Sequence, residues 1–313
     1  MKAVHFDGTS LGFNPEFPDP TDGTIVRVDL AGICGTDIEI ASGYMGYKGV
    51  LGHEFVGTVV KSESAALVGQ RVVGEINVAC ERCHTCAAGL TRHCPHRSVL
   101  GILNRNGAFA EYLSLPERNL HVIPDSVSNH QAVFVEPLAA AFEILEQVPL
   151  RPEWRVAVLG DGRLGQLISM VLDRYSKVKC FGRHQDKLDR LENLGVSASM
   201  CIESADIGRF DVVVDATGSS SGLIDATKLA RPRGTIILKS TTASGSNHNL
   251  TQTIINEFTL VGSRCGPFAP AIDALSSGII SVEDMVDCTY SLDRYGEAFE
   301  RAKSGALKVL FAP

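Results

Sequence analysis

Four cysteines stand close together in the chain, in the spacing C-x₂-C-x₂-C-x₇-C: Cys80, Cys83, Cys86 and Cys94. Two short turns would let four thiolates surround one ion in the tetrahedral geometry that structural zinc takes. Four sulfurs leave no open coordination position, so such a site stabilises a lobe and catalyses nothing. The spacing therefore predicts a structural zinc lobe over about residues 78–96. An iron–sulfur cluster or unmetallated thiols are the alternatives.

A glycine pattern of the form G-x-G-x-x-G follows the apolar run 156–159 and opens a helical pattern. In this context the small residues let the backbone approach a pyrophosphate at the positive end of a helix. The residues of this turn that we expect to contact a dinucleotide are Gly160, Gly162, Arg163, Leu164 and Gly165. The alternative is a plain tight turn that binds nothing.

The second strand of this unit ends without the acid that accepts a hydrogen bond from the ribose 2′-hydroxyl in NAD-binding proteins. Gly182 leaves room there for a 2′-phosphate, and Arg183, His184 or Lys187 could pair with that phosphate. The sequence therefore predicts a preference for NADP, with NAD possible. The alternative is that these residues form a solvated basic face and that Asp186 takes the role of the acid.

The elements that must position these residues differ between the two parts of the chain. Residues 1 to about 130 hold short β-branched runs punctuated by Gly and Pro, which predicts a mostly-β domain. From about residue 155, apolar runs at 156–159, 178–181, 211–215 and 235–239 alternate with helical patterns. This alternation is typical of an α/β fold with a doubly wound parallel sheet. One further amphipathic helix is expected near 294–303.

Composition limits the classes of partner. The 313 residues are 44% hydrophobic and 21% charged, which indicates a globular protein of about two domains. A formal charge of −7 gives no general attraction for nucleic acid or an anionic membrane, and no uncharged apolar run reaches the length of a membrane helix. The charge balance therefore favours a small-molecule ligand. The first residues hold no run of signal-peptide length, so we expect a cytoplasmic protein.

Two short motifs combine with these features. Cys34 lies in Gly-Ile-Cys-Gly-Thr-Asp, and His53 lies in Gly-His-Glu. With the four-cysteine lobe, Glu136-Pro-Leu, the glycine turn and Asp-Ala-Thr-Gly at 215–218, the chain resembles the zinc-containing medium-chain alcohol dehydrogenases of the polyol, threonine and sugar branch. The resemblance implies a GroES-like catalytic domain over 1–137, a Rossmann NADP-binding domain over 138–265, and a segment 266–313 that returns to the catalytic domain.

The resemblance also implies a second, catalytic zinc, which makes two zinc ions per subunit. Its ligands would be Cys34, His53 and Glu136, with Glu54 as an alternating or replacing ligand. A carboxylate at 136 makes the ligand set harder and easier to exchange than cysteine would. The alternative for Glu136 is a carboxylate that only favours the start of a helix before Pro137.

Further roles follow from the same resemblance. Thr36 would take the proton of the alcohol, and Asp37 would fix the tautomer of His53, although both could simply be turn residues. Glu39 stands where a proton-relay histidine is common, so the relay beyond Thr36 differs here. Thr217 and Lys308 are implied cofactor contacts, with Lys308 at the pyrophosphate or, alternatively, in solvent.

The function expected from these residues is zinc-dependent hydride transfer between NAD(P) and a secondary alcohol, polyol- or sugar-like, that becomes a ketone or aldehyde. Zinc would lower the pKa of the bound alcohol. A zinc-independent enone or quinone reductase on the same fold, and a non-catalytic NADP-binding protein, are the alternatives. Members of the family are dimers or tetramers, so a homodimer or homotetramer is expected.

Overall fold

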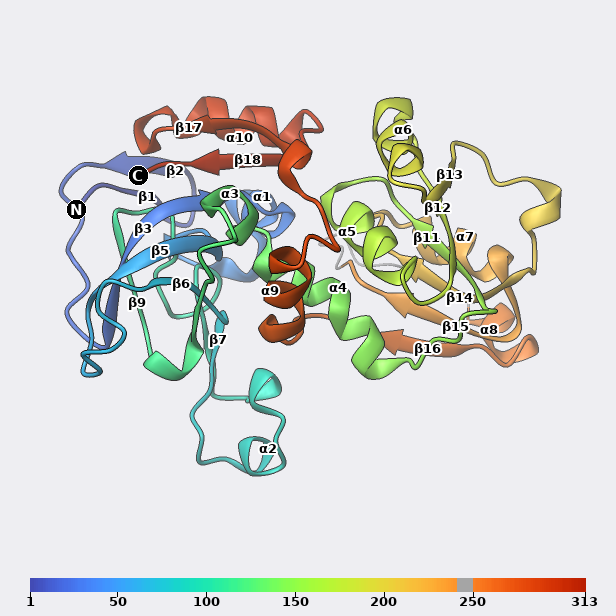
Figure 1. Cartoon of the computed structure of the whole chain (residues 1–313), viewed down its shortest axis with the longest axis horizontal. Helices are drawn as coiled ribbons and strands as arrows, with labels where there is room; N and C mark the ends of the chain where they lie inside the picture. Colours follow the sequence, from blue (N-terminus) through green and yellow to red (C-terminus); the bar gives the residue numbers. More distant parts are fainter. Residues whose placement is uncertain (241–249) are drawn as a thin grey trace. The chain divides into compact units, whose positions relative to one another are not determined.

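The chain folds as two units in the computed structural model, and the first unit contains both termini (Figure 1). Unit 1 comprises Met1–Glu136 and Phe268–Pro313, and unit 2 comprises Pro137–Pro267. The structure describes residues 1–240 and 250–313. Within those ranges, no helix is both long and apolar enough to cross a membrane.

Unit 1 is built mainly of strands, as its β-branched runs predict. Its strands are β1 Ala3–Phe6, β2 Leu11–Asn14, β3 Thr24–Gly32, β4 Gly49–Val50, β5 Glu54–Lys61, β6 Arg71–Gly74, β7 Asn77–Val78, β8 Ser98–Val99, β9 Tyr112–Leu115, β10 Leu120–Val122, β17 Val286–Tyr290 and β18 Lys308–Phe311. Its helices are α1 Gly35–Ala41, α2 His84–Ala87, α3 Asn129–Ala132, α9 Phe268–Ser276 and α10 Tyr295–Lys303. The largest sheet has the order β10-β6-β5-β3-β18-β17, with β9 paired to β3.

Strand register brings three distant segments of unit 1 together. β3 pairs with β5 so that Gly32 lies opposite Glu54, and β18 pairs with β3 so that Leu310 lies opposite Gly32. Both pairings are antiparallel. As a result, the residues just after β3, those just before β5 and the start of β18 meet at one end of the sheet.

Gly52 helps to fix the segment before β5. Its φ of +92° is in the left-handed region, and a Cβ at this position would overlap the ring of Phe109. Phe109 in turn packs edge-on against Phe311 of β18, with ring centroids 4.9 Å apart. This buried aromatic contact holds the residue that follows Gly52 in a defined place.

The segment around α2 projects from the sheets of unit 1, to which β7 and β8 join it (Figure 1). Cys94 is the one buried residue between residues 79 and 98. A loop of this length with so little buried apolar surface cannot stabilise itself by hydrophobic burial. Another source of stability is therefore needed for this lobe.

Unit 2 is a parallel sheet with helices packed on it, as the alternation in the sequence predicts. Its strands are β11 Arg155–Leu159, β12 Lys177–Phe181, β13 Ser197–Ser199, β14 Phe210–Asp215, β15 Ala230–Leu238 and β16 Thr259–Gly262. Its helices are α5 Arg163–Leu172, α6 Gln185–Asn193, α7 Gly222–Leu229 and α8 Thr251–Ile255, and α4 Val135–Gln147 begins in unit 1 and continues into it.

The order of the six strands is β13-β12-β11-β14-β15-β16. Numbered along the chain this is 3-2-1-4-5-6, the order of a doubly wound dinucleotide-binding sheet. The strand order reverses between β11 and β14, and ligands of such sheets bind at the carboxyl ends of the strands beside that point. The glycine turn directly follows β11 and therefore lies there.

Candidate functional site

Cys34, His53 and Glu54 form a compact group in unit 1. One potential ligand atom from each lies within 4.8 Å of the others. Cys34 is half-buried at the N-terminus of α1, while His53 and Glu54 are buried where β5 begins. A thiolate, an imidazole and a carboxylate at this separation are a ligand set that suits zinc. The register of β3 and β5 explains why they meet.

Asp37 connects the two segments that carry this group. Its carboxylate accepts hydrogen bonds from the backbone N–H of Cys34 at 2.8 Å and of Gly52 at 3.1 Å, and so joins the two ligand-bearing segments. Its Oδ1 lies 3.3 Å from His53 Nδ1. Asp37 is thus where a carboxylate must lie to orient that ring.

The surroundings of His53 favour a bound cation. Burial disfavours the charged imidazole, but the negative charges of Asp37 and Cys34 outweigh it and raise the pKa of His53 well above its usual value. The same charges stabilise a metal ion in contact with the ring, and such an ion would displace the proton.

Glu54 has a partner that its sequence motif does not reveal. Lys308, at the start of β18, is completely buried, and its Nζ donates to Glu54 Oε2. The other oxygen, Oε1, is buried and has no hydrogen-bond partner among the described residues. A buried carboxylate oxygen without a partner is costly, and a metal ion at the group would satisfy it. This orphaned atom is the observation that fits the three residues to a metal.

The burial of Lys308 differs from one expectation drawn from sequence. The alternative that Lys308 is exposed to solvent is wrong, because 0% of this residue is exposed. Its ammonium is held within unit 1 by Glu54 and lies 5.2 Å from the ring centre of Phe134. Contact with a cofactor pyrophosphate stays a prediction.

Changing Lys308 to Met is expected to lower the free energy of unfolding by about 3 kcal/mol or more, because it leaves the Glu54 carboxylate buried without its charge partner. Urea unfolding measures the effect. Lys303→Met is the matched control: Lys303 pairs with Glu300 on the surface, and loss of such a pair costs about 1 kcal/mol at most. Equal stability of the two variants would contradict a buried ion pair.

Three other residues of the implied site lie outside this group. Thr36 Oγ1 is 3.8 Å from Cys34 Sγ, so the hydroxyl lies beside the metal-ligand group. Glu136 is half-buried in the first turn of α4 and is not among the three grouped side chains. Glu39 is exposed on α1. Whether Glu136 completes the ligand set stays a prediction.

The four cysteines of the lobe come together as their spacing predicts. The distances between sulfur atoms are 3.5 Å for Cys83 to Cys86, 3.8 Å for Cys83 to Cys94 and 3.5 Å for Cys80 to Cys94. A tetrahedron with Zn–S bonds of ~2.3 Å has edges of about 3.8 Å, so these separations suit one zinc and exclude disulfides.

Backbone geometry prepares this cluster for an ion. Hydrogen bonds from the N–H groups of Arg82 and Cys83 help to lower the pKa of Cys80 to about 6. Glu81 adopts a φ of +60°, which turns the chain tightly between Cys80 and Cys83. Amides that stabilise a thiolate make it a better metal ligand.

The glycine turn of unit 2 has the geometry that a pyrophosphate needs. Gly160 has a φ of +110°, and a Cβ on Gly165 would overlap the carbonyl oxygen of Gly160. Gly162 is the N-cap of α5; it has no side-chain cap, and a Cβ there would meet nothing within 4 Å. The N–H groups of Arg163, Leu164 and Gly165 in the first turn thus begin a helix whose end suits an anion.

Thr217 lies next to this turn, after β14. Its Oγ1 donates to Asp215 Oδ1 at 2.7 Å, and a Cβ on Gly160 would be 3.3 Å from the Thr217 Cα. The Asp-Ala-Thr-Gly motif thus lies on the other side of the point where the strand order reverses.

The end of β12 corrects one sequence interpretation. Gly182 does not leave an empty space for a phosphate, because a Cβ there would overlap the side chain of Asp161. His184 is not free either, since its Nδ1 is 3.0 Å from Asp161 Oδ1. Arg183 and His184 are exposed, and Lys187 is half-buried. Asp161 was not expected here, because its contacts cross from one strand end to the next.

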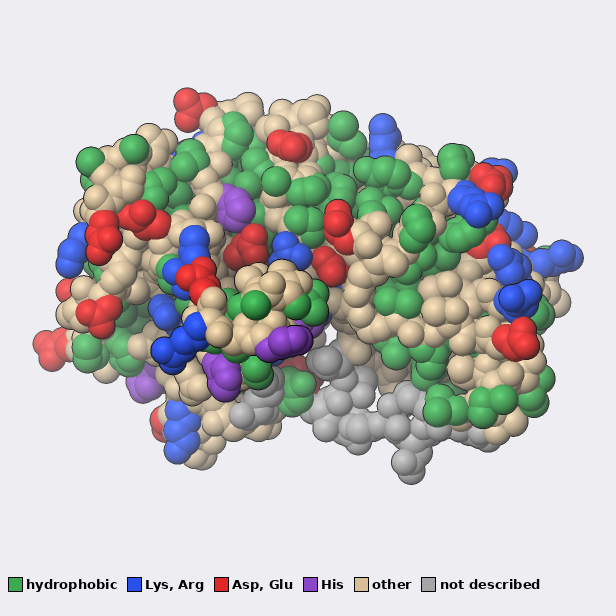
Figure 2. Space-filling view, turned by 90° about the horizontal axis from the view of Figure 1, so that it is seen from below, with side chains coloured by type: hydrophobic (Ala, Val, Ile, Leu, Met, Phe, Trp, Pro, Cys, Tyr) green, Lys and Arg blue, Asp and Glu red, His purple; other side chains and the backbone are tan. Residues whose placement is uncertain are grey.

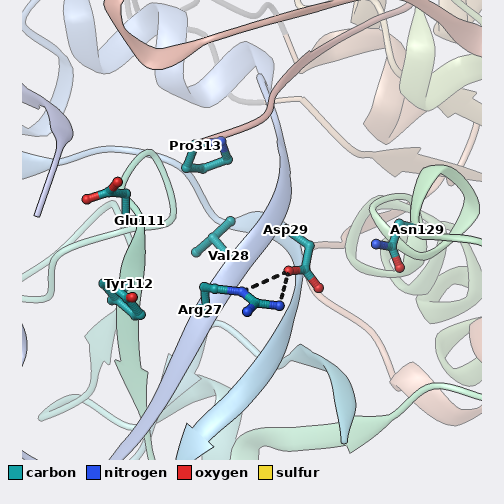
Figure 3. Close-up of a pocket in the computed structure, with 7 residues that line it drawn as sticks. All are labelled: Arg27, Val28, Asp29, Glu111, Tyr112, Asn129 and Pro313. Atoms are coloured by element: carbon teal, nitrogen blue, oxygen red, sulfur yellow. Dashed lines mark hydrogen bonds and ion pairs between the residues drawn. The ribbon is translucent and has the colours of Figure 1, made fainter. Parts of the chain in front are cut away.

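A surface pocket of about 520 Å³ in unit 1 involves none of these residues (Figure 3). It is lined by Arg27, Val28, Asp29, Glu111, Tyr112, Asn129 and Pro313. Asp29 accepts from Arg27 at 3.3 Å and from Thr58 at 2.9 Å, so its charge is already satisfied. The pocket offers no unpaired charge at Asp29 for a ligand.

On the face of the molecule shown in Figure 2, acidic and basic side chains are interspersed.

Comparisons with known proteins agree with this geometry. Residues 20–125 match the alcohol dehydrogenase GroES-like domain, and residues 129–311 match the glucose dehydrogenase C-terminus. The probable D-xylulose reductase A of Aspergillus clavatus is 30% identical over 327 residues, which cover 95% of this chain and 91% of that protein.

Solved structures give the same result. An alcohol dehydrogenase (rspB) of Escherichia coli CFT073, complexed with NADH, is similar with a TM-score of 0.90 at 28% identity. The match covers 100% of this chain and 99% of the other. A putative zinc-binding dehydrogenase of Sinorhizobium meliloti 1021, bound to NADP, has a TM-score of 0.89 at 27% identity, again over 100% and 99%.

A GroES-like unit and a doubly wound sheet with a glycine turn define the medium-chain dehydrogenase class. Within it, this chain belongs to the zinc-type alcohol dehydrogenase family, in the branch of the polyol dehydrogenases. It is an oxidoreductase that acts on CH–OH groups with a nicotinamide cofactor.

Proposed function

We propose that the chain is a zinc-dependent dehydrogenase that interconverts a polyol- or sugar-like secondary alcohol and its ketone or aldehyde. The observation that carries the proposal is the group of Cys34, His53 and Glu54, with a buried Glu54 oxygen that lacks a partner. The name of the xylulose reductase relative supports the substrate class.

The ligand atoms follow from the contacts of each side chain. Cys34 would ligate through Sγ. Since Asp37 lies against His53 Nδ1, the nitrogen left for the metal is Nε2. Glu54 would use Oε1, because Oε2 is held by Lys308. Glu136 is the further ligand that the family implies, and in that case Glu54 alternates with it.

A zinc ion held by Cys34, His53 and Glu54 would supply a Lewis acid that lowers the pKa of a bound alcohol, and a bound nicotinamide cofactor would supply the hydride acceptor. Thr36 is the residue that would take part in the proton transfer. Its hydroxyl, beside Cys34 Sγ, is placed to accept the alcohol proton at Oγ1 and to pass its own proton towards solvent. Glu39, exposed on the same helix, replaces the histidine that commonly ends this relay.

Three further inferences, on the second zinc, the cellular compartment and the oligomeric state, extend this proposal. The lobe cysteines would hold a second, structural zinc, which makes two per subunit. None of the nine cysteines forms a disulfide, as suits a reducing compartment such as the cytoplasm. We also infer a homodimer or homotetramer: β16 is an edge strand with exposed Leu260, and Ile254 and Ile255 before it are exposed.

The test is a substrate screen with NAD⁺ and NADP⁺ over polyols, sugars and primary alcohols. We expect oxidation of secondary alcohols of the polyol type, loss of this activity after chelation, and recovery after Zn²⁺ is returned. Reduction of enones or quinones that continues after zinc removal would instead favour the zinc-independent reductase. Cofactor binding without any turnover would favour a non-catalytic protein.

A further inference from the structure

Asp161, a residue of the glycine turn, contacts the loop that follows β12 through its carboxylate. Asp161 Oδ2 accepts a hydrogen bond from the backbone N–H of Arg183 at 2.6 Å and another from that of His184 at 2.7 Å. The ring of His184 donates from Nδ1 to the same carboxylate at 3.0 Å. Asp161 thus joins the turn after β11 to the end of the neighbouring strand.

The environment keeps this carboxylate charged and in place. Only 6% of Asp161 is exposed. Burial opposes its ionisation, but the hydrogen bonds from His184 and Arg183 outweigh burial and lower the pKa of Asp161. Only glycine fits at position 182 beside this carboxylate, because a Cβ there would overlap the Asp161 side chain. β12 does not end in an acidic residue, but the carboxylate of Asp161, from the glycine turn, lies at that end of the strand.

The location of Asp161 decides what it can recognise. In a doubly wound sheet, the adenosine ribose of the cofactor lies between the glycine turn after the first strand and the end of the second. β11 and β12 are those two strands, paired in parallel so that Leu159 lies beside Phe181. A carboxylate there accepts a hydrogen bond from a ribose hydroxyl, and it repels a 2′-phosphate.

We propose that Asp161 takes the place of the missing strand-end acid and makes the enzyme prefer NAD over NADP. This rests on the proposed function, and it reverses the NADP preference expected from sequence. The backbone N–H groups of Arg183 and His184, which could otherwise hold a phosphate, are already occupied by the Asp161 carboxylate. A carboxylate accepts about four hydrogen bonds, so it keeps capacity for a ribose hydroxyl.

The experiment measures the dissociation constants of NADH and NADPH by fluorescence titration of the zinc-loaded protein. Asp161→Asn preserves shape and the capacity to accept the two backbone hydrogen bonds, but it removes the charge. Asp186→Asn is the control, since Asp186 is exposed at the start of α6 and is the rival candidate for the same role. Asp161→Ser is the second variant, and the thermal midpoint of each protein reports on folding.

We expect the unchanged protein to bind NADH at least about tenfold more tightly than NADPH, and Asp161→Asn to shift that ratio towards NADPH by about tenfold or more. Asp186→Asn should leave the ratio as it was. Tighter binding of NADPH by the unchanged protein, or an unchanged ratio in both Asp161 variants, would overturn the role of Asp161 while the dehydrogenase proposal stands. If neither dinucleotide binds the unchanged protein, the proposed function falls as well.

Discussion

Replacing Cys34 with serine is expected to lower kcat by about a thousandfold or more while the protein still folds and binds NADH. The thiolate is a ligand of the proposed zinc, and loss of Lewis-acid stabilisation worth several kcal/mol corresponds to a rate loss of this size. The fold should tolerate the change, because Cys34 is the N-cap of α1 and serine is favoured at that position.

The measurement combines steady-state kinetics, zinc content and NADH titration on one preparation. The control is Cys201→Ser, since Cys201 is an exposed cysteine outside both clusters, and full activity is expected of it. Turnover by Cys34→Ser at the unchanged rate would show that the group in unit 1 is not the catalytic metal site.

Loss of one lobe cysteine is expected to unfold the lobe. Structural zinc contributes about 10 kcal/mol or more of binding free energy in small zinc domains, and here Cys94 supplies the buried side chain of residues 79–98. Cys94→Ser should therefore lose one zinc per subunit and become sensitive to protease within that segment. Limited proteolysis with mapping of the cleavage sites and elemental analysis measure both effects.

The matched control for the lobe is Cys288→Ser, because Cys288 is half-buried in β17 and belongs to neither metal-ligand cluster. It should keep its zinc and its resistance to protease. A Cys94→Ser protein that also keeps both would show that the lobe is stabilised by something other than a metal.

Much of the fold follows from local patterns in the sequence. The alternation after residue 155 predicts the parallel sheet, and the structure confirms its strands β11, β12, β14 and β15. β13 is not predicted, because Ser197–Ser199 has no apolar pattern and pairs only through its backbone. β16 carries an exposed rather than a buried surface, so it lacks the same signal.

The ligand-type residues are recognisable by type and motif, but their partners are not. Cys34 and His53 are 19 positions apart in the sequence, and only the β3–β5 register shows that they meet. Lys308 reaches Glu54 across a separation of 254 residues, which no local pattern encodes. Asp161 sits inside a recognised glycine motif, yet its side chain acts on the end of another strand. Such long-range pairings require the folded chain.

The most direct test of zinc-dependent dehydrogenation is the number of zinc ions per subunit, measured by elemental analysis before and after mild chelation, with turnover followed on the same samples. We expect two zinc ions, of which one is lost readily together with activity and restores activity when it is returned. One tightly held zinc at full metal loading, with turnover unaffected by chelation, would contradict it. The group of Cys34, His53 and Glu54 would then not be a metal site.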